Sequence, residues 1–487
     1  MPATRIKQVE AWLSTLPHED PQACARAMAD FLALHDREAL PFAFRKQLFE
    51  HVTANARRVV NLLLAELRER SLPLDARHQA MAGLVLALLR VAVDFAERLM
   101  TEAGVKSRPW FGESPLPGLT SQFFHLQSQI MALCHQTHRA LPTGFWVATH
   151  KAGLGVFETG LVGLRDPANP AATLGERYLA LLLEAAADPY HFSHQERIWL
   201  HDLIARYGGL VVITPARLAN QGGVYGIRAA EDKPPTPLAW RPESLHECDL
   251  VLNTAPLVRK LAMIVNQLDH EGEVRHALPV VRHPAYRELL RRLKSQWGGA
   301  SQRITIRHRP AKPSQRNAMI GFYPIYRLLS GRTEPGDART MAVCQLVNES
   351  AGGIALQVSQ PSFRIKIGTL VGVGRGAGGA WHDLGMVRWF KIGSTGVLTF
   401  GVKYLQGRLL PGHWARVGQD PVNPGLVSVP DPVRGPQQPR HLVVPCVQLA
   451  EDERLEIVQG GRREEIRLAG LVERLPEVEV YRLGQVD

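Results

Sequence analysis

The 487-residue sequence lacks the features that mark secreted and membrane-spanning proteins. Its N-terminus has no signal-peptide pattern, and its longest apolar run, Ala80 to Leu89, is about half the ~20 residues of a membrane helix. The five cysteines are scattered, odd in number and never spaced as Cys-x-x-Cys, so we expect reduced core thiols. These absences predict a cytoplasmic protein with no membrane span.

Motifs for catalysis are also scarce. There is no Gly-x-Ser-x-Gly sequence, and the glycine-rich run from Gly372 to Gly379 lacks the Gly-Lys-Ser/Thr of a P-loop and is expected to be a flexible hairpin. Three short strings match enzyme or metal-ligand patterns without the partner residues that such chemistry needs: Glu38-Ala39-Leu40, His201-Asp202, and Cys134 with His135 and His138. We infer a non-enzyme with no metal and no cofactor.

An apolar fraction of 45% is ample for folded cores, and the net charge of +11 with a pI near 9.6 suits an anionic partner. The basic residues concentrate between Arg287 and Arg332, with very few acids among them. A nucleic-acid-binding surface would have a similar charge. However, the sequence has no helix-turn-helix, zinc-finger or RNA-recognition signature, so we do not expect nucleic acid as a partner.

The pattern of apolar residues predicts an α+β multidomain protein. Residues 1–240 show helical spacing, as in the apolar face formed by Phe49, Val52 and Ala56 on a helix from about Pro41 to Arg70, and predict an irregular α-helical bundle. Two further amphipathic helices predict a helical connector over residues 241–300. Alternating runs then predict an antiparallel β-barrel over 301–410, with Met319 to Leu329 as one of its strands. A Pro/Gly-rich linker is expected over 411–440 and a β segment packed on the barrel over 441–487, with a hairpin at Gly460-Gly461.

A turn between two strand-like runs is the most informative feature of the barrel region. Asn348 offers a donor and an acceptor, Ser350 offers a hydroxyl, and Gly352 and Gly353 allow positive φ or close approach of a ligand to the backbone. Such clusters are common in ordinary turns, so the surrounding sequence must show whether this turn is a ligand site.

Four elements around this turn occur in a recognisable order. Arg303 and Arg307 form Arg-x-x-x-Arg, Asn348 to Gly353 form Asn-x-Ser-x-x-Gly, and the runs Gly385-Met386-Val387-Arg388-Trp389 and Gly401-Val402-Lys403-Tyr404-Leu405 follow. This order resembles the PilZ domain, the bacterial receptor module for cyclic di-GMP. The resemblance covers roughly residues 300 to 410.

The resemblance implies a cyclic di-GMP site formed by Arg303, Arg307, Asn348, Ser350 and Gly353. Lys312 and Arg316 form a second, imperfect Lys-x-x-x-Arg nearer the next strand, and remain an alternative basic pair. The ligand is a dianion with two guanine bases. Arginine suits it because the guanidinium can bind phosphate or a guanine edge through two hydrogen bonds and can stack on a base.

The sequence therefore predicts a cyclic di-GMP-binding signalling effector that passes its state to an unidentified protein partner through the helical domain. One alternative is a degenerate PilZ-like scaffold without ligand binding, which is favoured because the arginine element departs from the family pattern: Arg307 lies far from the turn. The other alternative is a nucleic-acid-binding protein.

Overall fold

The computed structural model describes residues 5–36, 38–68, 70–106, 114–216, 224–240, 247–271, 284–299, 307–332, 334–375, 381–393, 395–429, 440–450, 452–475 and 477–484. The chain forms two compact units. The first comprises Met1–Arg70, Leu74–Pro189 and His194–Gln302, and the second comprises Ser71–Pro73, Tyr190–Ser193 and Arg303–Asp487.

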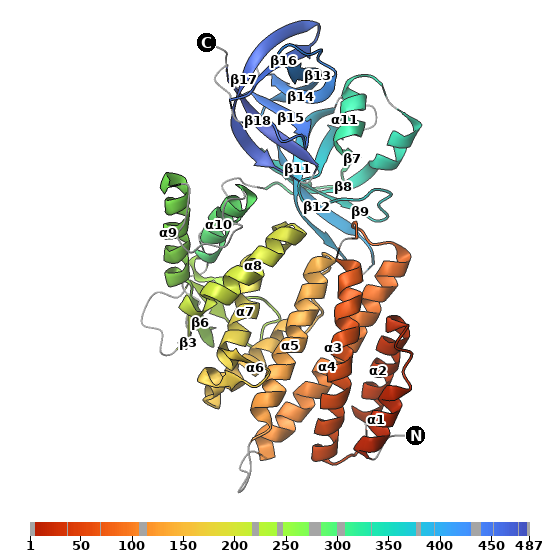
Figure 1. Ribbon diagram of the computed structural model, residues 1–487, viewed down its shortest axis with the longest axis vertical. Coiled ribbons are helices and arrows are strands. Elements are labelled where there is room, and N and C mark those ends of the chain that lie inside the picture. The colour runs from red at the N-terminus through yellow and green to blue at the C-terminus, as the bar shows by residue number, and fades with distance from the viewer. Residues whose placement is uncertain are drawn as a thin grey trace. The chain divides into compact units, whose positions relative to one another are not determined.

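The first unit is predominantly helical, as the sequence predicts. Its helices are α1 (Ile6–Ser14), α2 (Pro21–Asp36), α3 (Phe42–Leu67), α4 (Ala76–Lys106), α5 (Leu116–Gln136), α6 (Phe145–Glu158), α7 (Leu174–Ala186), α8 (His194–Tyr207), α9 (Ala255–Glu271) and α10 (Pro284–Trp297). Helices α2 to α5 lie side by side, with α4 packed against α2, α3 and α5 (Figure 1).

Two small sheets complete the first unit. Strands β1 (Arg165–Asp166) and β2 (Asn169–Thr173) form a hairpin, and a four-stranded sheet has the order β3-β6-β4-β5. The strands of that sheet are β3 (Val212–Pro215), β4 (Tyr225–Ile227), β5 (Thr236–Pro237) and β6 (Leu250–Asn253).

The helices bury the faces that their sequence periodicity predicts. On α3, Phe49, Val52 and Ala56 are buried at three- and four-residue spacing. Helix α7 begins with a capping box, in which the Glu176 amide donates to the Thr173 hydroxyl (3.1 Å) and the Thr173 amide donates to the Glu176 carboxylate (2.7 Å).

Helix α4 is the one described helix that is long and apolar enough to cross a membrane, over Ala76–Gly104. Half of its most apolar 18-residue window is buried inside the protein. A buried core helix meets the same criteria of length and composition, so this is weak evidence for a membrane span.

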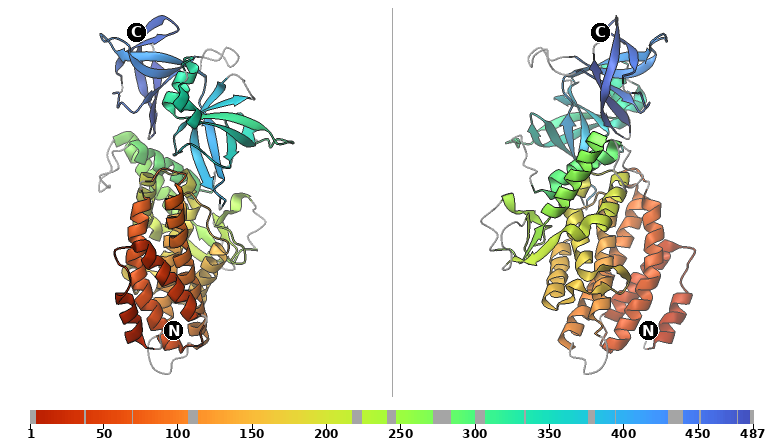
Figure 2. Two further views of the ribbon diagram at one scale, coloured as in Figure 1. Left: turned by 90° about the vertical axis from the view of Figure 1, so that its right-hand side faces the viewer. Right: turned by 60° about the vertical axis from the view of Figure 1, so that its left-hand side comes forward.

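The second unit begins with a closed antiparallel barrel of six strands (Figure 2). Its strands are β7 (Gln315–Ile320), β8 (Met341–Ser350), β9 (Gly353–Val358), β10 (Leu370–Arg375), β11 (Trp381–Ile392) and β12 (Leu398–Tyr404), in the spatial order β7-β8-β9-β12-β11-β10 with β10 paired to β7. The strand predicted from Met319 to Leu329 is wrong beyond Ile320, because Gly321 (φ 98°) breaks it and Phe322–Leu329 forms helix α11.

A second closed barrel follows, where the sequence predicted a linker and a β segment. Its strands are β13 (Arg408–Arg416), β14 (Asn423–Val429), β15 (His441–Pro445), β16 (Arg454–Gln459), β17 (Arg462–Arg474) and β18 (Val478–Gly484). Strands β13 and β14 thus lie in the region expected to be an irregular Pro/Gly-rich linker, and they contain Pro411 and Pro424. The hairpin predicted at Gly460-Gly461 is confirmed, with φ of 56° and 80° and Gln459 paired to Arg462.

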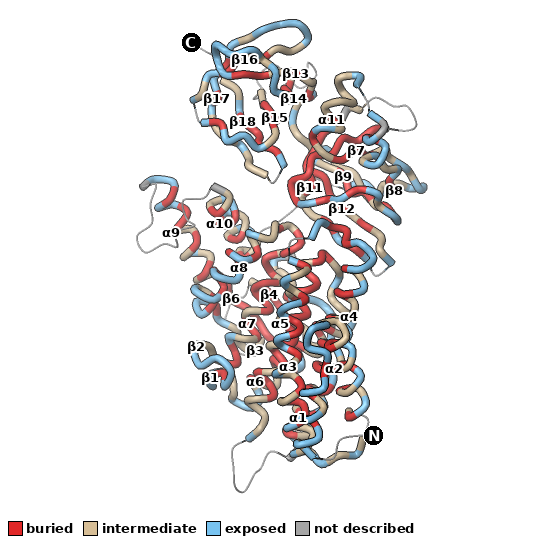
Figure 3. The backbone as a smooth tube through the Cα atoms, turned by 45° about the vertical axis from the view of Figure 1, so that its right-hand side comes forward, coloured by how far each residue is buried: buried red, intermediate tan, exposed pale blue. Residues whose placement is uncertain are grey.

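Both barrels have the same topology. In each, the spatial order is first, second, third, sixth, fifth and fourth strand, and the first strand pairs with the fourth. Buried residues of both barrels and of α11 form one apolar core: Met319, Phe322, Ile325, Leu370, Leu384, Met386, Leu409, Leu426, Val443, Val478 and Val480. Continuous buried stretches occur in β11 of the first barrel and in β14 and β15 of the second (Figure 3). The two barrels therefore support one another through this core.

Candidate functional site on the first barrel

A β-bulge in β8 determines which way the predicted ligand residues face. Leu346 pairs with Leu356, but Asn348 pairs with Ala355, so Val347 is an extra residue without its own partner. The extra residue moves Asn348 from the inner to the outer face of the barrel, because side chains alternate along a strand. Ser350, two residues further, shares this outer face.

A segment upstream of the barrel lies beside this strand. His308 and Glu349 form an isolated antiparallel bridge, in which the His308 amide donates to the Glu349 carbonyl (2.8 Å) and the Glu349 amide donates to the His308 carbonyl (3.0 Å). Opposed residues of an antiparallel pair share a face. The bridge therefore sets Arg307 level with Ser350, on the outer face of the barrel.

The same bridge sets Arg309 level with Asn348. Arg307 and Arg309 are both exposed. Sequence reasoning did not assign Arg309 to the site, although its position two residues after Arg307 is the spacing of one strand face. Arg303, the other arginine of the predicted pair, lies outside the described residues.

The alternative basic pair is placed differently. Lys312 is exposed on the stretch between the His308 bridge and β7. Arg316 pairs with the fully buried Cys344 and so faces the inner side of the barrel, where its guanidinium contacts Glu349 Oε2 (3.2 Å) and donates to Ser314 Oγ (2.8 Å). Tyr404 donates to Glu349 Oε1 (3.3 Å). Glu349 thus neutralises Arg316 on the face opposite to Asn348.

Gly353 has a structural reason to be glycine. A Cβ there would lie 2.3 Å from the Val402 carbonyl oxygen, so β9 and β12 could not approach each other as closely. The Ser350 hydroxyl donates across the turn to the Gly353 carbonyl (3.3 Å). The barrel itself therefore requires this glycine, whether or not a ligand also approaches it.

The later motifs contribute to the same outer face. Trp389 pairs with Gly401 after a second bulge at Arg388, and a Cβ on Gly401 would lie 2.1 Å from the indole Nε1, so the indole lies against bare backbone. Lys403 is exposed and pairs with Gly353, the partner of Ser350 across the turn. Lys403 is a second cation that sequence reasoning did not assign to the site, although it lies within the PilZ-like motif from Gly401 to Leu405.

The second barrel holds the bulge at Arg388 in place. The Arg388 guanidinium binds both carboxylate oxygens of Glu473 on β17, with 2.6 Å between Nη2 and Oε2. This pair is about one-quarter exposed on each side. Arg388, the extra residue of the bulge before Trp389, is therefore held in position by a residue of the second barrel.

The outer face brings together three exposed cations, one aromatic ring, one amide and one hydroxyl: Arg307, Arg309, Lys403, Trp389, Asn348 and Ser350. This combination suits a ligand with negative charge and planar groups. Within the described ranges, no group of three or more His, Cys, Asp or Glu side chains is arranged to hold a metal ion.

Comparison with known proteins addresses the helical unit. Residues 7–217 match the family model described as the N-terminal domain of the cyclic-di-GMP receptor FimW. No curated protein and no solved structure matches the chain.

Proposed function

Because residues 7–217 match the N-terminal domain of a cyclic-di-GMP receptor, we propose that this protein is a cyclic di-GMP-binding signalling effector. In this proposal the ligand lies on the outer face of the first barrel, beside β8. Arg303, Arg307, Asn348, Ser350 and Gly353 form the predicted site. Two independent parts of the chain support the proposal, since the family match lies in the helical unit and the PilZ-like motifs lie in the barrel.

The observation that carries the assignment of the site is the bridge between His308 and Glu349. It brings Arg307 and the Asn-x-Ser element, about forty positions apart in the sequence, onto one face. Arg307 can then bind a phosphate or the O6 and N7 atoms of guanine through two hydrogen bonds, while Asn348 binds a base edge. Ser350 is placed for a phosphate oxygen.

The charges around the site favour a dianion. Arg309 and Lys403 flank the predicted residues, and the nearest acid of β8, Glu349, faces inward and is engaged by Arg316 and Tyr404. An inward acid adds little repulsion to a ligand on the outer face. Arg316 also lies on the inner face, whereas Arg307 lies on the outer face with Asn348, so we favour Arg307 over Arg316 as the ligand-binding arginine.

The output of the effector, in this proposal, is a protein partner bound by the helical unit in the cytoplasm, and the protein acts without catalysis. A degenerate scaffold remains the alternative if cyclic di-GMP does not bind. A nucleic-acid-binding protein would instead show small losses from every basic substitution and a steep dependence on salt.

Calorimetry with the full-length protein tests the proposal. We expect a micromolar dissociation constant, equivalent to about −8 kcal/mol. Arg307→Ala and Asn348→Ala should each weaken binding at least about tenfold, because each removes a direct contact to a charged ligand or a base edge. Lys312→Ala is the matched control, since it removes an exposed cation from the same segment, and should change the affinity less than about threefold.

Absence of saturable heat up to ~100 μM cyclic di-GMP would contradict the receptor proposal and favour the scaffold. Equal losses from Arg307→Ala and Lys312→Ala would contradict the placement of the site.

A further inference from the structure

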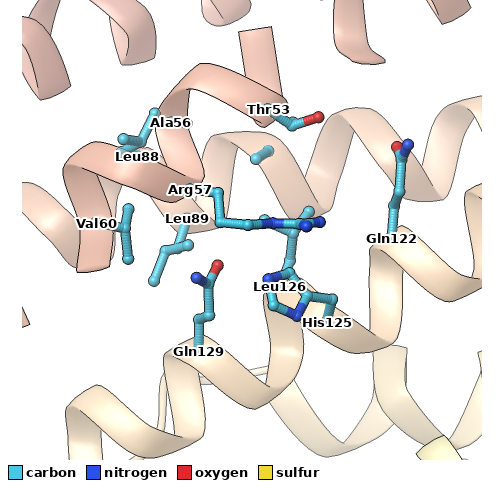
Figure 4. A pocket seen from close by; sticks show the side chains of 11 residues that line it. Thr53, Ala56, Arg57, Val60, Leu88, Leu89, Gln122, His125, Leu126 and Gln129 are labelled. Atoms are coloured by element: carbon cyan, nitrogen blue, oxygen red, sulfur yellow. The ribbon is translucent and has the colours of Figure 1, made fainter. Parts of the chain in front are cut away.

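A small polar niche opens between helices α3, α4 and α5 of the first unit. Its polar lining comes from Thr53 and Arg57 on α3 and from Gln122, His125 and Gln129 on α5, while leucine and alanine side chains of α4 form its apolar wall. The three α5 residues recur at three- and four-residue spacing and so share one face. Arg57 reaches across above His125, between Gln122 and Gln129 (Figure 4).

Two buried polar atoms of the niche have no hydrogen-bond partner among the described residues. They are Gln122 Oε1 and His125 Nε2. Leaving a buried polar atom without a partner is costly, so these atoms mark a place where water or a further group can bind. Both side chains line the same niche, which makes it the place for that group.

The niche is positively charged. Among the residues that the structure describes, no acidic side chain forms an ion pair with Arg57. Burial, followed by the positive charges of Arg57 and Arg177, lowers the pKa of His125 to about 4, although Asp166 opposes this. The imidazole is therefore neutral at pH 7 and can present an N–H at Nε2. The glutamine amide can present its NH2 group by rotating through half a turn.

We propose that this niche binds a single carboxylate group. The Arg57 guanidinium would hold it through charge-assisted hydrogen bonds, with further N–H donors from His125 and Gln122. A volume of ≈ 20 Å³ admits little more than the end of a ligand, because one water molecule needs about 10–15 Å³. Cyclic di-GMP is far too large, so the niche is distinct from the barrel site and does not depend on the proposed function.

The carboxylate could belong to a free metabolite or to an aspartate or glutamate side chain of a partner protein. The chemistry of recognition is the same in both cases. A partner protein should bind more tightly than a free metabolite, because its acidic segment adds contacts around the opening of the niche.

The test is an NMR titration of full-length protein with histidines labelled at Cε1, at pH 7. Sodium acetate is added to about 200 mM, against sodium chloride at matched ionic strength, which controls for screening. We expect one of the nineteen histidines, His125, to shift with saturation and a dissociation constant on the order of 10 mM. Arg57→Gln should weaken acetate binding at least about tenfold. Arg58→Gln, which removes the neighbouring exposed arginine, should leave acetate binding unchanged.

A second titration uses an acidic peptide rich in glutamate. At least about tenfold tighter binding than acetate, again lost in Arg57→Gln, supports a protein carboxylate. Binding no tighter than that of acetate supports a free small carboxylate. The proposal is overturned if neither probe gives a saturable shift of His125, because the niche then holds only water. It is also overturned if the shift persists unchanged in Arg57→Gln, because the carboxylate then binds without Arg57.

Discussion

Arg307 and Arg316 should separate ligand binding from stability. Arg316 lies on the inner face of the barrel, its side chain is 19% exposed, and it contacts Glu349 and Ser314. Arg316→Gln should therefore lower the free energy of unfolding by about 1–2 kcal/mol, since hydrogen bonds to charged groups contribute about 1.5–3 kcal/mol and partial exposure reduces this. Its effect on cyclic di-GMP affinity should be less than about threefold, equivalent to ~0.7 kcal/mol.

Arg307→Gln should show the opposite pattern. Arg307 is exposed, so its loss should change the free energy of unfolding by less than about 0.5 kcal/mol. Its loss should weaken ligand binding at least about tenfold, equivalent to ~1.4 kcal/mol.

Chemical denaturation followed by circular dichroism measures the stability of each variant, and calorimetry measures its affinity. The double variants extend the comparison: Arg303→Ala with Arg307→Ala should lose binding, and Lys312→Ala with Arg316→Ala should keep most of it. Loss of binding in Arg316→Gln at unchanged stability, with Arg307→Gln unaffected, would refute the reasoning and move the site to the second basic pair.

Two further predictions concern buried and inter-barrel ion pairs. Burial disfavours the ionised form of Glu184, but hydrogen bonds from His135 (2.7 Å) and His201 outweigh it and hold the pKa of Glu184 below its usual range. The stability contributed by the ionised Glu184 carboxylate and its two histidine partners is therefore present at neutral pH and lost as the pH falls through the lowered pKa of Glu184. Denaturation at pH 7 should show Glu184→Gln to be about 2–3 kcal/mol less stable than the wild type, and this difference should shrink towards pH 3; a constant difference would contradict the assignment. Glu473→Gln weakens the hold on Arg388, so calorimetry should show cyclic di-GMP binding weakened about threefold, and an unchanged affinity would show that the second barrel does not position the site.

Helices and single hairpins follow from the sequence because their patterns are local. The apolar face of α3 and the paired glycines at Gly460-Gly461 each specify one backbone conformation. The second barrel does not follow in the same way. Pro411 and Pro424 suggest irregular chain, yet both lie within paired strands, and only the pairing of distant segments reveals this.

The candidate site shows the same limit. Residue types and order identify Asn348, Ser350 and the arginine element, but the face on which each lies depends on the bulge at Val347, which no residue pattern marks. Without that bulge, Asn348 would face inward, as Arg316 does. Arg309 and Lys403 join the site only because strand pairing places them there.

Hydrogen–deuterium exchange tests the central claim most directly, because it locates the bound ligand along the chain. Saturating cyclic di-GMP should slow exchange both in peptides covering residues 307–317 and in peptides covering residues 346–353, since a ligand held by both segments stabilises the bridge between His308 and Glu349. Exchange that is unchanged in both segments while calorimetry shows saturable binding would contradict the account, because the ligand would then bind elsewhere on the protein.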